Sequence, residues 1–458
     1  MKNNKKAIAV IVVVALVILI AVAVALVLGS AFKETGSITL NDSKGEAFAT
    51  ASWDGYDITY TVDNEYEQAY AEYVVEEAKN IFVEAEKTDA DKANDYVFKN
   101  IKYINTNYNP EAQKLLKDGY DKNTKLLKAE CAMAITDLNG KLVAVFSNGT
   151  EENFALKKTY AGSTIKPLSV YAPAIDSGKF NWSYAIVDSP VKKVQEQDGS
   201  FSDWPANSDG RYTNKKMTLV KALAFSTNTV AVKLLQEYGV KNSVKILEET
   251  YGMNVEFEKE KMNGVGEDEI LGNIALGYLY EGVSVVDMAG YYQVFANGGK
   301  YTKPKAVDEI FDENGSVYKS EYTSVKAMKT ETADIMNKML EKVVKVGTGV
   351  EANVKNIKVV GKTGTTSDNA DNWFVGVTPE YSCAVWHSKV SDDNICPEVF
   401  GSIFEGVEAT VEDFPGSGKI EAKVYCEKSG LLRGERCIYC NKGYYLKTEN
   451  LAQCEDCK

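Results

Sequence analysis

The stretch AMAITDLNGKLVAVF at residues 132–146 decides the fold class that we predict for this chain. It contains two mostly apolar runs, 132–136 and 141–146, separated by Asn139-Gly140. An Asn-Gly pair between two such runs is a strong hairpin signal, because both residues tolerate the positive φ of a tight turn. The stretch therefore predicts two antiparallel strands at the start of a domain.

Helical segments follow this hairpin, and further strands follow the helices. Helices are predicted from about Ser163, over 218–238 and over 331–346, whereas residues 188–212 are rich in Ser, Asp, Pro and Gly and indicate a surface loop. Three β-like runs come later, at 357–361, 372–377 and 381–387. Strands at both ends with helices inserted between them predict an α+β fold, an antiparallel sheet flanked by helices.

The region before this domain is predicted to cross a membrane once. Residues 7–28 are 22 consecutive apolar residues without a charge, which at 1.5 Å per residue span roughly 33 Å, enough for a bilayer core. Three lysines precede the run, so we expect a cytoplasmic tail at 1–6 and an extracytoplasmic location for the rest. A cleaved signal peptide is the alternative, although its apolar region is normally shorter.

Two further regions flank the main domain, which we place at 126–400. Residues 29–125 begin polar, with short alternating stretches such as 56–62, and turn helical after Glu65, which indicates a stalk or a small β element and a linker. Residues 401–458 form a Cys-rich C-terminal extension that holds five of the eight cysteines: Cys426, Cys437, Cys440, Cys454 and Cys457. Disulfides are the default outside the cell, the two Cys-x-x-Cys pairs leave a zinc site as the alternative, and free thiols are the remaining option.

Charge and composition narrow the function classes. The chain of 458 residues has 52 Lys and Arg against 65 Asp and Glu, a formal charge of −13, which argues against nucleic acid as a partner because phosphate binding needs clustered cations. It has one His, His387. A single imidazole leaves little room for His-rich metal centres or His-based catalysis, and we expect His387 to be structural.

Three short motifs stand in order along the main domain: Ser163-Thr-Ile-Lys166, Ser226-Thr-Asn228 and Lys362-Thr363-Gly364. Ser-x-x-Lys alone is a weak signal, because it recurs at Ser30, Ser189 and Ser316. Only Ser163 opens a predicted helix with both other motifs downstream. The helix places Ser163 and Lys166 on one face, where backbone N–H groups can also stabilise an anion.

These residue types suit nucleophilic catalysis by serine. A serine needs a base, and a buried lysine can serve when desolvation lowers its pKa. Ser226 offers a hydroxyl that can relay the proton, and Asn228 an amide for peptide bonds. Lys362, predicted at the end of a strand, brings a cation for a carboxylate, with Thr363 and Thr365 as further donors. A nucleotide P-loop is excluded, because Asn356 stands where that motif needs glycine.

The motifs and their surroundings resemble the transpeptidase domain of penicillin-binding proteins, in particular the bifunctional class that makes peptidoglycan. The resemblance runs from about Tyr103 to Ser388, with a looser match at Cys426 to Cys437. Further matching segments are Asn273–Gly277, Glu281–Ser284, Phe295–Gly299, Asp371–Gly376 and Ser429–Leu432.

The resemblance implies the serine transpeptidase/β-lactamase-like fold and a DD-transpeptidase that acylates its serine with D-Ala-D-Ala stem peptides and, covalently, with penicillin. Hydrolysis of the same acyl-enzyme would give DD-carboxypeptidase activity. The implied catalytic residues are Ser163, Lys166, Ser226 and Lys362, and the implied substrate-binding residues are Asn228, Thr363, Gly364 and Thr365. The backbone N–H groups of Ser163 and Thr365 would form the oxyanion hole. No cofactor or metal is implied.

Two departures from the family pattern matter. No match to a glycosyltransferase domain is found, so we expect a separate glycan polymerase as partner. Tyr160-Ala161 stands where Gln-Pro is usual before the reactive serine. Three other functions fit the sequence less well. A β-lactamase would need a Glu base that we do not find, a penicillin-sensing receptor would need more than residues 1–6 on the cytoplasmic side, and a catalytically idle module would not need intact motifs.

Overall fold

The structure is a computed structural model that describes residues 36–455 except 126, 128, 197, 390–392, 409 and 412. The predicted cytoplasmic tail and the membrane anchor at 7–28 lie outside the described residues. Within the described range, no helix combines the length and the apolar character needed to cross a bilayer.

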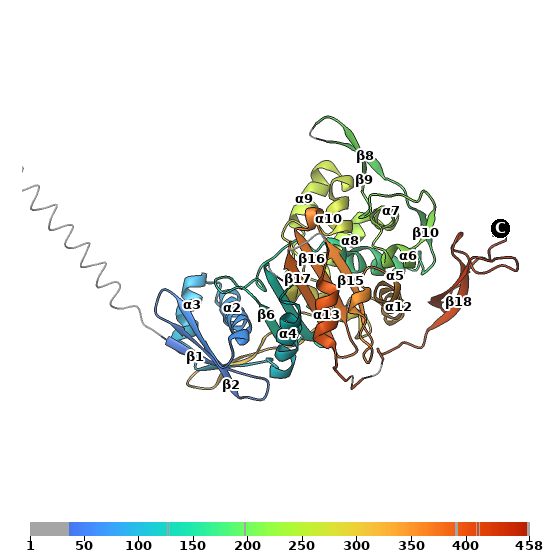
Figure 1. Cartoon of the computed structure of the whole chain (residues 1–458). Coiled ribbons are helices and arrows are strands. Elements are labelled where there is room, and N and C mark those ends of the chain that lie inside the picture. The colour runs from blue at the N-terminus through green and yellow to red at the C-terminus, as the bar shows by residue number, and fades with distance from the viewer. Residues whose placement is uncertain are drawn as a thin grey trace, which may run out of the picture.

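A five-stranded antiparallel sheet forms the centre of the main domain, with the strand order β15-β16-β17-β5-β6 (Figure 1). Its strands are β5 Cys131–Asp137, β6 Leu142–Ser147, β15 Val360–Thr365, β16 Asp371–Val377 and β17 Tyr381–Ser388. The hairpin predicted at 132–146 is confirmed by the pairing of β5 with β6. The run predicted at 357–361 instead begins at Val360 and continues to Thr365, so Lys362 lies inside the strand and not at its end.

Side chains alternate across this sheet, so each face contributes to a different apolar core. Ala132 and Ala134 of β5 pack with the core around α11 Val285–Tyr292. Met133 and Ile135 pack with the core under α4 Pro110–Asn123 and α13 Cys396–Phe404. The period of two along β5 thus sets the layers: helices cover both faces of the sheet.

The helical part of the domain departs from prediction at the second motif. The single helix predicted over 218–238 is wrong: strand β10 Lys216–Thr218 and helix α6 Leu219–Ala224 are followed by a break, and α7 runs over Asn228–Tyr238. Ser226 lies in the break with a φ of 57°. Ser, Thr and Asn favour helix ends over helix interiors, because their side chains bond nearby backbone groups. The apolar periodicity continues through the break and conceals it.

Other elements surround this core. The predicted helix at 331–346 is confirmed as α12 Thr330–Val346. The segment predicted as surface loop contains a hairpin of β8 Lys192–Gln195 with β9 Phe201–Trp204. The remaining elements include α5 Ala172–Asp176, β7 Ala185–Val187, α8 Val240–Glu249, α9 Glu256–Val265, α10 Leu271–Leu276, β11 Lys300–Thr302 and β14 Ser324–Lys326.

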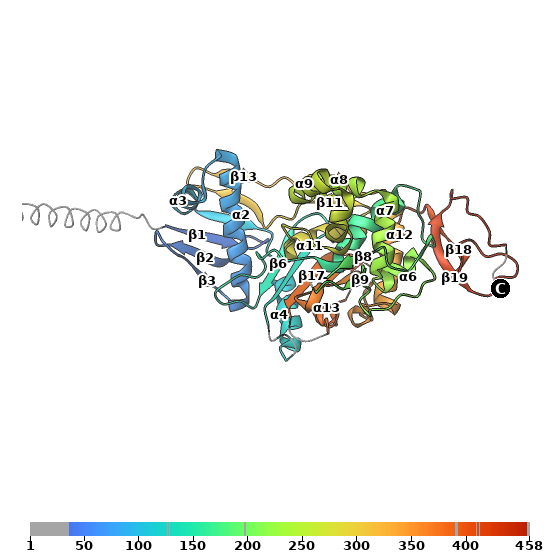
Figure 2. The same cartoon turned by 90° about the horizontal axis from the view of Figure 1, so that it is seen from above.

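Where a stalk and linker are predicted, the structure has a six-stranded sheet with the order β13-β12-β4-β1-β2-β3. It combines β1 Gly36–Asn41, β2 Ala47–Trp53, β3 Ile58–Val62 and β4 Tyr103–Thr106 with β12 Val307–Phe311 and β13 Ser316–Lys319 from much later in the chain. Helices α2 Gln68–Glu86 and α3 Ala90–Asn100 pack on it (Figure 2). The alternating stretch at 56–62 contains β3, in line with the small β element allowed for this region, but the pairing with β12 and β13, which are distant in sequence, could not be predicted from local patterns.

The C-terminal extension forms a hairpin of β18 Ile420–Cys426 and β19 Cys440–Leu446, at the opposite end of the molecule from the six-stranded sheet (Figure 2). Cys426, Cys437 and Cys454 form a small buried cluster with Cys440 packed against it, and Cys454 is disulfide-bonded. Within the described part of the chain, no three metal-ligating side chains are placed to hold an ion. The predicted ligand Cys457 lies outside that part.

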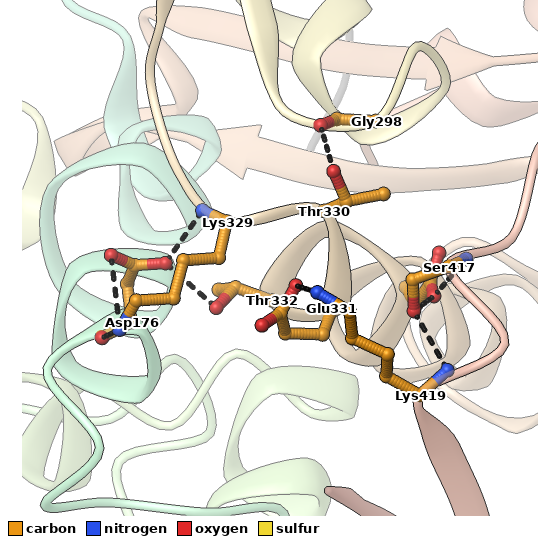
Figure 3. A network of polar contacts seen from close by, with 9 residues as sticks. Asp176, Gly298, Lys329, Thr330, Glu331, Thr332, Ser417 and Lys419 are labelled. Atoms are coloured by element: carbon orange, nitrogen blue, oxygen red, sulfur yellow. Dashed lines mark hydrogen bonds and ion pairs between the residues drawn. The ribbon is translucent and has the colours of Figure 1, made fainter.

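The start of α12 joins three segments (Figure 3). The Asp176 carboxylate accepts hydrogen bonds from the backbone N–H of Lys329 and from Thr332 Oγ1, both at 2.7 Å. It therefore satisfies the first turn of a helix whose own N-cap, Lys329, provides no capping side chain. Glu331 and Lys419 pair at 3.3 Å and link the C-terminal extension to the same turn. Asp176 thus fixes the start of the helix that ends next to the third motif.

We predict that Asp176→Ala lowers the free energy of unfolding by about 1–2 kcal/mol, because the helix start loses both a cap and a favourable charge. Lys419→Ala removes the neighbouring ion pair, but Lys419 is 65% exposed, so we expect a loss of about 0–1 kcal/mol. Urea unfolding of both variants measures the difference. Equal losses would show that Asp176 contributes only as a surface charge.

Candidate active site

Ser163 lies in a tight turn, Gly162–Ile165, at the beginning of the helical segment that continues into α5. Gly162 has a φ of 53°, and a Cβ placed on it would lie 3.0 Å from the backbone nitrogen of Thr365. Its N–H donates to the Gly277 carbonyl at 3.3 Å. Only glycine fits here, and its absent side chain lets the serine turn lie directly against the end of β15.

Gly364 provides the matching gap on the strand. A Cβ on Gly364 would lie 2.7 Å from the Ala161 carbonyl oxygen and 2.8 Å from Thr164 Cγ2. A glycine inside a strand often marks the close approach of a ligand or of another backbone segment. The structure shows that the approaching group at Gly364 is the protein's own serine turn, so this glycine positions Ser163 relative to β15.

Lys166 is fully buried, and its amine points at the second motif. Nζ donates to Ser226 O at 2.8 Å, to Ser226 Oγ at 3.3 Å and to Asn228 Oδ1 at 2.6 Å. All three acceptors are neutral oxygens. Burial, and to a smaller extent the charge of Lys362, holds the pKa of Lys166 well below its usual value. The amine is therefore suited to accept a proton near neutral pH.

The break between α6 and α7 makes these contacts with Lys166. The left-handed backbone of Ser226 brings its carbonyl and hydroxyl to the same amine, which a continuous helix would not do, because its carbonyls point along the axis. Asn228 opens α7, and its backbone N–H donates to Asn207 Oδ1 at 3.0 Å. The strained backbone of Ser226 therefore places two of the three oxygens that contact the Lys166 amine.

Lys362 is the second buried amine. Its side chain is 0% exposed, and Nζ donates to Thr363 O at 3.0 Å and Thr363 Oγ1 at 3.3 Å. Burial lowers the pKa of Lys362 to about 7, whereas the sequence led us to expect a fixed positive charge. Thr363 Oγ1 also lies 2.6 Å from Thr348 Oγ1, just beyond the end of α12. Near neutral pH the amine is thus poised between its two protonation states.

The side chains of all three motifs open on one cavity of about 430 Å³. Ser163, Ser226, Asn228, Thr363 and Thr365 line it, while Lys166 and Lys362 lie buried behind these residues and Gly364 behind the serine turn. The structure therefore brings together every residue that the sequence motifs single out. His387 does not line this cavity; it is buried on β17 opposite Asn372, with Nδ1 2.6 Å from Ser388 O.

Eight further residues line the cavity, and sequence reasoning did not single them out: Asn207, Ser208, Tyr278, Thr348, Thr366, Ser367, Asn369 and Asn394. Three of them follow the third motif within a few residues, so their proximity to Lys362 was a usable signal. The others come from loops whose approach depends on the tertiary fold, and single-sequence patterns carry no such information.

Comparison with known proteins gives one family. The sequence profile of the penicillin binding protein transpeptidase domain matches residues 130–395. Penicillin-binding protein 1A of Clostridium botulinum is 32% identical over 308 residues, which are 64% of this chain and 36% of that protein. Penicillin-binding protein 1A/1B of Bacillus subtilis is 31% identical over 392 residues, 78% of this chain and 40% of that protein. The chain thus spans about two fifths of the length of these relatives.

Solved structures show the same fold. The D,D-transpeptidase domain of a peptidoglycan glycosyltransferase from Eggerthella lenta superposes with a TM-score of 0.61 and 19% identity, covering 81% of this chain and 97% of that one. Penicillin-binding protein 1A from Haemophilus influenzae superposes with a TM-score of 0.55 and 21% identity, covering 70% of this chain and 53% of that one. The main domain therefore has the mixed α/β serine transpeptidase fold, as the resemblance implied.

Two glycines test whether the serine turn is held by close contact. Gly162 and Gly178 both have positive φ, but a Cβ on Gly178 meets nothing within 4 Å. We expect Gly178→Ala to lower the free energy of unfolding by about 1–2 kcal/mol through backbone strain alone. Gly162→Ala should lose about 1–3 kcal/mol more, because its Cβ also crowds Thr365. Denaturant unfolding measures both, and equal losses would mean that the turn can move away from β15 freely.

Proposed function

This chain belongs to the penicillin-binding protein transpeptidase family, and from that premise we propose that it is a peptidoglycan DD-transpeptidase that works through a serine acyl-enzyme. The observation that carries the proposal is the buried amine of Lys166, whose pKa burial lowers and whose Nζ lies within hydrogen-bond distance of Ser226 and Asn228 beside the cavity that Ser163 lines. A serine next to a neutral amine is an activated nucleophile.

In the proposed acylation, neutral Lys166 takes the proton of Ser163 as its oxygen attacks the carbonyl between the two terminal D-alanines. The negative oxygen of the tetrahedral intermediate is stabilised by the backbone N–H groups of Ser163 and Thr365, which the Gly162 contact brings close together. Lys166 then returns the proton through Ser226 to the leaving amine, and D-alanine departs. An amine of a second stem peptide attacks the ester and releases the serine, which completes the cross-link.

The same groups explain recognition. We assign the C-terminal carboxylate of the stem peptide, or the carboxylate of a β-lactam, to the hydroxyls of Thr363 and Thr365, with protonated Lys362 buried behind them and donating to Thr363 Oγ1 at 3.3 Å. Charge-assisted hydrogen bonds of this kind contribute about 1.5–3 kcal/mol each. A β-lactam acylates Ser163 by ring opening and leaves no separate amine to depart, so the acyl-enzyme persists. Asn228 is assigned to the substrate's peptide bond.

We further propose that residues 7–28 anchor the chain in the cell membrane with residues 1–6 in the cytoplasm and the catalytic domain outside. We also propose that the nascent glycan strands come from a separate polymerase. A purified chain that elongates glycan strands from a lipid-linked precursor would contradict this last point.

Penicillin labelling tests the nucleophile. We expect a fluorescent penicillin to label the purified protein on Ser163, and Ser163→Ala to abolish the label. Ser189→Ala is the matched control, because Ser189 also begins a Ser-x-x-Lys sequence but bonds Lys233 Nζ through its Oγ at 2.7 Å. Mass mapping of the labelled peptide identifies the site. Full labelling of the Ser163 variant would end the assignment.

The two lysines should differ in their dependence on pH. Lys166 acts as the neutral form, so acylation rises with pH through its pKa. Lys362 acts as the charged form, so acylation falls as pH rises through about 7. Lys362→Arg fixes the charge, and the fall near pH 7 should disappear although the rate below that pH drops by about one to two decades. Lys166→Arg should abolish acylation, because Arg is no base at this pH.

Second-order acylation rates with one penicillin across pH 5–9 decide the matter, since they report the pKa values of the free enzyme. If Lys166→Arg acylates normally while Lys362→Arg is inactive, Lys362 and not Lys166 is the general base.

A further inference from the structure

Asn394 lines the active-site cavity but belongs to none of the three motifs. It lies in the segment between β17 and α13, and its side chain reaches the end of the strand that carries Lys362. Nδ2 donates to Gly364 O and to Trp373 O, both at 2.9 Å. These two residues face each other on β15 and β16, so one amide bridges both strands at the place where the serine turn packs.

The other end of the same amide is fixed to a helix. Asn394 Oδ1 accepts the backbone N–H of Cys396 at 3.0 Å, in the first turn of α13. Helix α13 packs on the sheet through Phe400, whose ring lies 4.9 Å from that of Phe374. The amide of Asn394 therefore transmits the fixed position of α13 to the end of β15.

This support matters because β15 is an edge strand. It pairs with β16 on one side only, and its free edge faces the cavity, so its last residues have half of the usual backbone partners. Gly162 approaches within about van der Waals contact of Thr365 at that end. Small shifts of reacting groups have large effects on rate, so an additional tie at Gly364 limits the movement that would separate Ser163 from Thr365.

Asn394 also acts on the Thr365 hydroxyl. Nδ2 lies 3.3 Å from Thr365 Oγ1, and an amide nitrogen can only donate. Thr365 Oγ1 is therefore the acceptor, and its own hydrogen must point away from Asn394. Thr365 is exposed to the cavity, and within the described residues its hydroxyl makes this one hydrogen bond. The free direction for the proton is the cavity.

We propose that Asn394 is a positioning residue that holds the end of β15 in place and aims the Thr365 hydroxyl at the substrate carboxylate. This inference rests on the proposed function, since the carboxylate belongs to the assigned substrate. Asn394 itself needs no contact with substrate, because its two N–H hydrogens are already shared among the oxygens of Gly364, Trp373 and Thr365.

A double-mutant cycle with Thr365→Val tests whether Asn394 acts through that hydroxyl. We expect Asn394→Ala to lower the second-order rate of acylation by benzylpenicillin roughly threefold to tenfold. In the Thr365→Val background the same change should lower the rate less than twofold. Multiplicative losses, or a wild-type rate for Asn394→Ala, would overturn the proposal.

Asn394→Asp tests the Nδ2 donor without removing the side chain that supports the fold. It keeps the acceptor for Cys396 N–H but replaces the donor by an oxygen that faces three other oxygens, and the Thr365 proton would turn towards it. We expect a loss of about tenfold or more. A rate within twofold of wild type would overturn the proposal, even if Asn394→Ala failed to fold.

Asn297→Ala is the matched control. Asn297 also donates to a carbonyl, Leu138 O at 2.9 Å, and accepts a backbone N–H, from Lys300 at 3.0 Å, but it does not line the cavity. Thermal unfolding of both alanine variants is measured beside the acylation rates. We expect similar stabilities and a normal acylation rate for Asn297→Ala, and an equal rate loss in both variants would overturn the proposal. A wild-type protein that penicillin does not acylate would instead defeat the proposed function, and this inference with it.

Discussion

Two lysine amines are buried within one domain, and among the described residues neither has a carboxylate partner. Removing an ammonium from water is expensive unless it is paired, hydrogen-bonded or deprotonated. Here neutral oxygens replace the solvent: the Ser226 and Asn228 acceptors for Lys166, and Thr363 for Lys362. The acceptors for Lys166 depend on an irregularity of the fold, because a helix that continued through Ser226 would direct its carbonyl along the helix axis. The acceptor for Lys362 is the next residue of its own strand.

The glycines follow from the same requirement. Burying Lys166 and Lys362 brings the serine turn and β15 into direct contact, and no side chain fits between them at Gly162 or Gly364. The motif glycine is thus set by packing between two parts of the protein. A substitution there would separate the proposed nucleophile from the strand proposed to bind the carboxylate, so stability and the proposed chemistry are coupled at these positions.

The sequence predicted the sheet and most of the site, and its failures have physical causes. The hairpin at 132–146 and helix α12 were predictable because each has a strong local signal, an Asn-Gly turn and a 3.6-residue period. The helix break at Ser226 was missed because apolar spacing continues through it. Asn394 could not be found, since its role depends on strands and a helix that meet only in three dimensions. The full sheet of the N-terminal region was missed because β12 and β13 come from beyond residue 300.

That last pairing has a consequence for how the catalytic cavity is held in space. A flexible linker lets an attached domain sample a volume that grows with linker length, and the effective concentration of the domain near any fixed target falls accordingly. In this molecule the strands after Gly36 form a sheet that is extended on one side by β12 and β13 of the main domain. Reach and orientation from residue 36 to the cavity are therefore fixed by folded protein. The region is a folded spacer, so the distance from residue 36 to the cavity does not grow with linker length.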